Sequence, residues 1–134
     1  MSLDNALNTT RSTVPECVAC GLVDMKTGML LGIKTVDSHP QEVLDLVAAA
    51  TGDLFQGQNV TAIEQTFKRM RGLKDDGHRY FQEIVVLSDN LIHVFQRCKR
   101  NEDLVLAVVC RISANLGMVL SKARTQLDPV EKNA

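Results

Sequence analysis

The sequence lacks tryptophan and has few other aromatic residues, with one tyrosine and four phenylalanines among its 134 residues. Proteins that bind single-stranded nucleic acid combine basic grooves with aromatic rings that stack on the bases, and a net charge of −1 argues against such a groove. No apolar run is long enough for a transmembrane helix. The polar start of the chain, with Asp4, Asn5 and Asn8, is not typical of a secretory signal. We therefore expect a cytoplasmic protein without a nucleic-acid partner and without stable membrane insertion.

Motifs for catalysis are also missing from the sequence. It contains no Gly-Lys-Ser/Thr phosphate loop, no Gly-x-Ser-x-Gly motif and no pair of histidines at helical spacing. His39, His78 and His93 fall in a predicted helix start, a loop and a strand, so we expect no metal site. The segment Asp75-Asp76-Gly77-His78 is typical of a solvated loop. The sequence thus predicts a protein that is not an enzyme and that binds no cofactor.

Four cysteines are present, and Cys17 and Cys20 form a Cys-x-x-Cys motif. Such a motif can indicate a redox pair or half of a zinc site. Residues three apart on a β-strand point to opposite faces, however, so the two thiols are expected to diverge. Cys98 and Cys110 are isolated in the sequence. We therefore expect all four cysteines to be small, reduced core residues.

The strongest structural signal is a run of seven apolar residues from Leu104 to Cys110. So short a run, rich in β-branched residues, predicts a strand that is covered on both faces. Short connections make the neighbouring strands antiparallel. The other predicted strands cover residues 16–24, 29–35, 80–88 and 91–98.

Two short helices are predicted near the ends of the chain. The first covers residues 3–12, and the last covers residues 113–126 with Ser113 as its capping residue. Residues 128–134 are expected to be a frayed tail, which leaves a core at about 14–127.

Residues 40–70 predict a long helix that begins at the capping residue Ser38. One apolar stripe follows its first half, and a second stripe lies roughly on the opposite side of a straight helix. Gly52 and Gly57 make a break plausible. Either the helix bends so that both stripes meet one core, or it continues and the second stripe faces something else. The second stripe consists of Val60, Ile63, Phe67 and Met70.

These segments predict a single α+β domain over residues 1–134 with the element order (α)ββαβββα. The two most apolar strands belong in the middle of the sheet, so the expected strand order is 2-1-5-4-3, with helices on both faces.

The segment Glu83–Leu87 is unusual for a strand at the edge of this sheet. Edge strands normally carry proline, lysine or other devices against pairing with another chain, and this apolar segment carries none of them. Together with the second helical stripe, it predicts an interface between two copies of the chain. The alternative is a helix that bends over the edge and buries both. The expected interface residues are Leu54, Val60, Ile63, Phe67, Met70, Tyr80, Ile84, Val85 and Val86.

Several segments together carry a resemblance to a known family: the hairpin from Cys17 to Gly28, the long helix, Ile84–Leu87, Leu91–Val94, Leu104–Cys110 and Asn115–Gly117. Over about residues 14–127 the chain resembles the roadblock/dynein light chain family. The resemblance implies a profilin-like αββαβββα fold. It also implies a homodimer whose long helices pack together and whose third strands pair into one continuous sheet. The chain departs from the family in its long 71–79 loop and in Gly52 and Gly57.

Members of that family bind or regulate small Ras-like GTPases, as the bacterial gliding-motility activators do, or serve as dynein-attached adaptors. The resemblance therefore implies a dimeric interaction module that acts on a GTPase by biasing its switch loops. An arginine supplied in trans by Arg69, Arg71 or Arg79 is a further option. Two other functions stay open. One is a small-ligand sensor of the PAS-like or GAF-like type, in which several short helices between the second and third strands surround a pocket, as a break at Gly52–Gly57 would allow. The other is a structural subunit of a larger assembly.

Overall fold

The structure, a computed structural model, describes residues 2–36, 41–74 and 77–134, and the side chains of the second range from residue 47 onward. The predicted cap Ser38, His39 and the Asp75-Asp76 pair lie outside the described residues. The strands are β1 (Cys17–Asp24), β2 (Met29–Thr35), β3 (Glu83–Leu87), β4 (Leu91–Arg97) and β5 (Leu104–Arg111). The helices are α1 (Leu3–Thr13), α2 (Gln41–Gln56), α3 (Gln58–Met70) and α4 (Leu116–Lys132).

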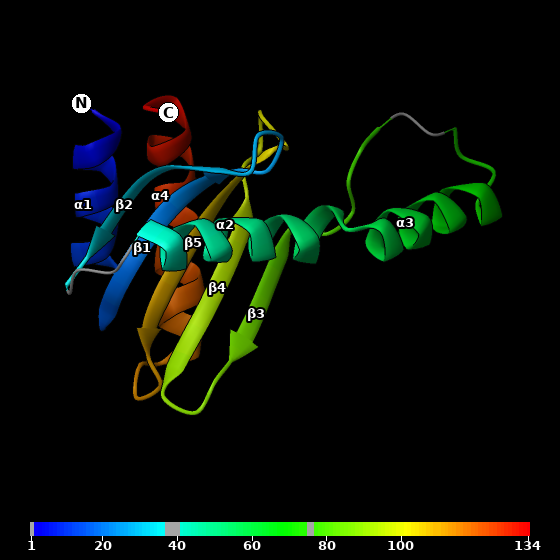
Figure 1. Cartoon of the computed structure of the whole chain (residues 1–134). Helices are drawn as coiled ribbons and strands as arrows, with labels where there is room; N and C mark the ends of the chain where they lie inside the picture. The colour runs from blue at the N-terminus through cyan, green and yellow to red at the C-terminus, as the bar shows by residue number, and fades with distance from the viewer. Residues whose placement is uncertain (1, 37–40, 75–76) are drawn as a thin grey trace.

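The five strands form one antiparallel sheet in the order β2-β1-β5-β4-β3, which confirms the predicted topology. Figure 1 shows α1 and α4 on one face of the sheet and α2 across the other. The predicted strand at 80–88 is shorter in the structure, because pairing with β4 begins only at Glu83. Tyr80 therefore lies outside β3.

The apolar run of β5 is buried on both of its faces. Leu104, Leu106 and Val108 face the larger core, which α1 and α4 cover. Val105 and Ala107 face the opposite side, where Phe55, from the end of α2, and Phe95 complete a smaller core. A strand in this position has no solvent-exposed side, which explains why the run contains no polar residue.

A single residue, Gly57, separates α2 from α3. A Cβ atom at this position would lie 2.6 Å from the carbonyl oxygen of Asp53, so the close approach requires glycine. In Figure 1, α3 continues away from α2 and extends past the β3 edge without folding back onto the sheet. Neither predicted alternative is fully correct, because the helix does break but the second stripe stays out of the core.

The last helix begins and ends later than predicted. Asn115 is its capping residue and accepts a hydrogen bond from the Met118 amide at 3.0 Å, so the assignment of the cap to Ser113 is wrong. The predicted frayed tail is also wrong, since α4 continues to Lys132. Val130 is fully buried, and the carboxylate of Glu131 accepts the Asn101 amide at 2.6 Å.

The geometry predicted for the Cys-x-x-Cys motif is wrong because β1 contains a bulge. Cys17 pairs with Cys110 and Ala19 pairs with Val109, so Val18 is an extra residue in β1. A bulge shifts the alternation of side chains by one. Both cysteines of the motif therefore face the larger core instead of diverging.

Replacement of Val130 with alanine tests the docking of the last turn of α4. We expect V130A to lower the free energy of unfolding by about 2 kcal/mol, because it leaves a cavity beside the fully buried site. Urea denaturation measures this. The control V36A removes the same atoms from a side chain that is 50% exposed and should change the free energy by less than about 0.5 kcal/mol. Equal effects would contradict the docked helix end.

Candidate interaction surface

Among the described strands, β3 pairs only with β4 and forms one edge of the sheet. The Arg97 amide donates to the Gln82 carbonyl oxygen at 2.8 Å. This bond determines which residues of β3 direct their backbone groups toward β4. Every second residue from Gln82 onward therefore bonds to β4, and the residues between direct their N–H and C=O groups outward. These outward-directed residues are Glu83, Val85 and Leu87.

The side chains along this edge are apolar and accessible. Val85, Val86 and Leu87 are 37%, 40% and 59% exposed. Ile84 instead packs against the smaller core. Val86 lines a shallow depression together with Leu54 of α2. The structure thus brings these predicted interface residues to one margin of the sheet.

A second apolar surface lies on α3. Ile63, Phe67 and Met70 are 46%, 52% and 79% exposed and line a depression on this helix. We call these three residues the α3 stripe. Val60 of the predicted interface is half-buried on the same helix. The α3 stripe lies beyond the edge of the sheet, and not on the margin that Leu54 and Val86 share (Figure 1).

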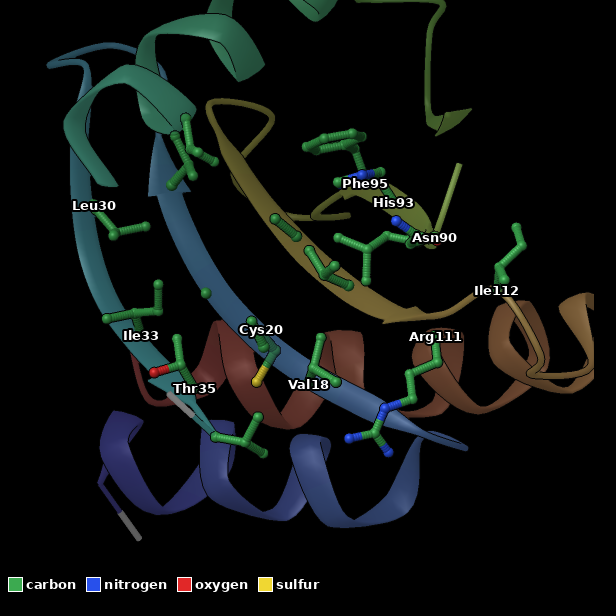
Figure 2. Close-up of a pocket in the computed structure, with 18 of the residues that line it drawn as sticks. Val18, Cys20, Leu30, Ile33, Thr35, Asn90, His93, Phe95, Arg111 and Ile112 are labelled. Carbon is green, nitrogen blue, oxygen red and sulfur yellow. The ribbon is translucent and has the colours of Figure 1, made fainter. Parts of the chain in front are cut away.

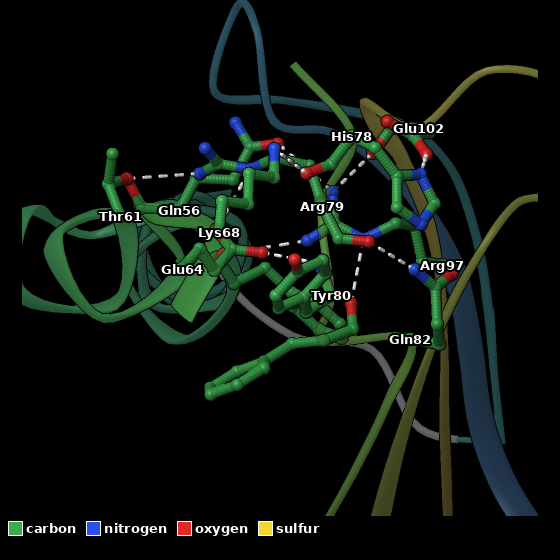
Figure 3. Close-up of polar contacts among 12 residues, drawn as sticks. Gln56, Thr61, Glu64, Lys68, His78, Arg79, Tyr80, Gln82, Arg97 and Glu102 are labelled. Atoms are coloured by element: carbon green, nitrogen blue, oxygen red, sulfur yellow. Dashed lines mark hydrogen bonds and ion pairs between the residues drawn. The ribbon is translucent and has the colours of Figure 1, made fainter. Parts of the chain in front are cut away.

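A buried polar cluster holds α3 in this projecting position (Figure 3). Glu64 and Lys68 of α3 are only 2% and 5% exposed. The Glu64 carboxylate accepts a hydrogen bond from the Tyr80 amide and lies 3.4 Å from the Arg79 guanidinium. The Lys68 ammonium donates to the His78 carbonyl oxygen at 2.7 Å and lies 5.6 Å from the centre of the Tyr80 ring. Tyr80 therefore anchors α3 rather than extending the β3 edge.

Arg97 joins this cluster to the sheet. Its side chain is enclosed, with the residue 1% exposed, and burial lowers the pKa of its guanidinium. The guanidinium donates to the carbonyl oxygens of Phe81 and Glu102, both at 2.8 Å, and to the Gln56 side chain at 3.3 Å. It also lies 5.0 Å from the centre of the Phe55 ring. One side chain thus connects the end of α2, the approach to β3 and the β4–β5 turn.

The polar cluster was not predicted from the sequence. The one signal for this cluster in the sequence is Arg97 itself, a charged residue at the end of an apolar strand. Its position indicates only that its guanidinium needs buried acceptors. Those acceptors are mostly backbone carbonyl oxygens, which every residue has. Their positions depend on the tertiary fold.

A cavity of about 700 Å³ lies on the α2 face of the sheet (Figure 2). Most of its wall is apolar, and polar side chains come from Thr35, Asn90, His93, Arg111 and Ser113. Burial lowers the pKa of His93, so this imidazole is neutral near pH 7. Within the described ranges, no group of three histidine, cysteine or acidic residues is placed to hold a metal ion. The cavity is suited to an apolar ligand.

Comparison with known proteins gives structural matches only. No protein-family model and no curated protein matches the sequence. A Roadblock/LC7 domain from Streptomyces avermitilis superimposes with a TM-score of 0.67 at 16% identity, over 98% of this chain and 97% of its own. The chain has the roadblock fold. The gliding protein MglB from Thermus thermophilus gives a TM-score of 0.67 at 22% identity, over 97% and 88%. A structure of MglB in a tetrameric arrangement gives 0.69 at 21%, over 97% and 85%.

The expected profilin-like order of the roadblock fold is therefore confirmed, with the long helix divided into α2 and α3. Within the described part of this roadblock fold, no helix is long and apolar enough to cross a membrane. The β3 edge and the α3 stripe each bring several exposed apolar side chains together on one element.

Replacement of Arg97 tests the polar cluster. We expect R97M to lower the free energy of unfolding by about 3 kcal/mol, because several buried carbonyl oxygens lose their donor. The control R100M removes an exposed guanidinium that pairs with Asp128 and should cost less than about 0.5 kcal/mol. Urea denaturation compares the two, and an R97M protein as stable as R100M would contradict this role.

Proposed function

We propose that this roadblock-like protein is a non-enzymatic, dimeric module that binds and regulates a small Ras-like GTPase. The observation that carries the proposal is the β3 edge, where apolar side chains and outward-directed backbone groups occur together. An accessible strand edge of this kind pairs readily with another strand. Self-pairing with a second copy satisfies the same groups on both chains.

A twofold axis through Val85 gives the simplest pairing of two β3 strands. An antiparallel arrangement then places Glu83 of one copy opposite Leu87 of the other and makes the interface isologous. Because α3 extends past the β3 edge, this helix would reach alongside the second copy (Figure 1). The predicted interface residues on β3 would thus form the dimer contact, and the exposed α3 stripe would bind the GTPase.

The GTPase as a partner is supported by the roadblock fold and by the structural similarity to MglB. Regulation would occur through contacts that bias the switch loops of the partner. An arginine supplied in trans would come from Arg69 or Arg71, which are exposed on and after α3. Arg79 does not suit this role, because its guanidinium faces Glu64 and donates to the Thr61 hydroxyl at 3.1 Å.

The 700 Å³ cavity favours a second candidate function, the binding of a small ligand as in sensor domains. Its apolar wall fits a molecule with an apolar body. A thermal-denaturation screen with apolar metabolites and with nucleotides tests it: a large increase in Tm with an apolar compound supports the sensor, and no shift with any compound argues against it.

Substitution V85P tests the β3 interface. Proline removes one outward N–H group and leaves the bonds between β3 and β4 in place, since proline is tolerated on edge strands. We expect self-association to weaken at least about tenfold, measured by analytical ultracentrifugation. The control M29K changes a side chain that is 59% exposed on the other edge strand and should leave the dimer unchanged. A V85P protein that remains a dimer as stable as M29K would refute the pairing.

Substitution F67E tests the role of the α3 stripe in binding the GTPase. A charge in the centre of the stripe should weaken binding to a Ras-like GTPase from the same organism at least about tenfold, because it would be buried at the contact. Surface plasmon resonance with the GTP-bound partner measures the affinity. The control Q65E adds the same charge to a neighbouring exposed side chain of α3. Equal affinities for both variants would show that the stripe does not contact the GTPase.

A further inference from the structure

All four cysteines lie in the larger core, and three of them, Cys17, Cys20 and Cys110, come from the paired strands β1 and β5. Cys17 is directly opposite Cys110 in the antiparallel pairing of these strands. The Arg111 amide donates to the Glu16 carbonyl oxygen at 3.1 Å, so Glu16 and Arg111 form a hydrogen-bonded pair. The next pair, Cys17 and Cys110, is therefore of the non-hydrogen-bonded kind.

This pair type has the backbone geometry that a disulfide requires. The Cα atoms of a non-hydrogen-bonded pair are about 4.5 Å apart, and disulfides join Cα atoms that are about 4.4–6.8 Å apart. Both side chains point into the same core. The register of β1 and β5 thus already places the two thiols opposite each other.

The bulge at Val18 adds a third thiol to the site. It turns Cys20 to the face that holds Cys17, and Figure 2 shows the Cys20 sulfur on the side of β1 away from the cavity. The pKa of Cys17 is lowered, chiefly by a hydrogen bond with the Cys110 side chain opposite. The thiolate is the nucleophilic form of cysteine. Cys17 is also the most accessible of the three, at 8% exposed against 2% for Cys20 and 0% for Cys110.

We propose that Cys17 and Cys110 are an oxidant-responsive pair that forms a reversible disulfide between β1 and β5. The Cys17 thiolate attacks one oxygen of hydrogen peroxide, which gives a sulfenic acid and, with one proton, water. Cys110 then loses its proton and attacks the sulfenic sulfur. This step forms the S–S bond and releases hydroxide, which takes up the proton as a second water. Peroxide is reduced, the two thiols are oxidised, and a dithiol reductant reverses the change.

The disulfide would act at one end of the cavity. Val18, Arg111 and Ser113 line the cavity beside the proposed bond. Glu16, which precedes Cys17, has a φ of 50° and accepts the Ser113 hydroxyl at 2.7 Å. Oxidation would link the segment that leads into β1, at Glu16, to the segment that follows β5, at Ser113. The β3 edge lies two strands away from β5 in the sheet, so dimer formation through β3 would be unaffected.

Peptide mapping of the full chain tests the pair directly. The protein is treated with hydrogen peroxide, its free thiols are alkylated, and it is digested with trypsin. Cys17 and Cys20 share the peptide 12–26, Cys110 lies in 101–111 and Cys98 lies in 98–99. We expect 12–26 joined to 101–111, the same link in C20S, its loss in C17S and C110A, and its loss after dithiothreitol. A link confined to 12–26, a link retained in C17S, or no link in the wild-type protein would each overturn the proposal.

Cys98 is the matched control within the same chain. It is 1% exposed, burial raises its pKa to about 12, and its backbone bonds to Leu104 rather than to another cysteine. We expect Cys98 to remain unmodified under conditions that convert the pair. The oxidised protein should also unfold at a Tm roughly 5–10 °C higher, since the bond closes a long loop. Oxidation of Cys98 at the same rate would show non-selective damage and overturn the proposal.

Discussion

The buried guanidinium of Arg97 determines where the end of α2, and with it α3, lies relative to the sheet. It binds carbonyl oxygens from two separate segments and stacks on the Phe55 ring, so the end of α2 cannot leave the sheet without exposing unpaired buried groups. The neighbouring pair of Glu64 and Arg79 continues the same cluster into α3. A helix that would otherwise be free to pack over the sheet is therefore held beyond its edge.

The two edge strands of the sheet, β2 and β3, differ in how they are covered. The β2 edge carries Lys34 and is packed by α1, whose Leu7 side chain approaches Gly32 so closely that a Cβ atom there would lie 2.9 Å from it. The β3 edge has no such cover among the described residues, and it is short and apolar. A projecting α3 beside an open edge leaves apolar surface that a single chain does not bury. This difference between the two edges is the physical basis for proposing that two copies pair specifically along β3 rather than aggregate non-specifically.

Much of the fold could be predicted because the deciding signals are local. The apolar run of β5 required a central strand, and the short connections required antiparallel neighbours, which together defined the sheet order. The errors came from interactions at long range. The bulge at Val18 reversed the facing of Cys17, and the contact of Glu131 with the β4–β5 turn extended α4 beyond its expected end. The projecting α3 depends on Arg97 and Glu64, whose partners are distant in the sequence.

Amide hydrogen exchange at Val85 and Leu87 tests the central claim most directly. Both amides point away from β4 in a single chain, so only a second strand can protect them. The account predicts that the exchange of these two amides slows as protein concentration rises, while the amides of Ile84 and Val86 stay protected throughout. Rapid exchange at Val85 and Leu87 at every concentration would contradict the pairing of two copies along β3.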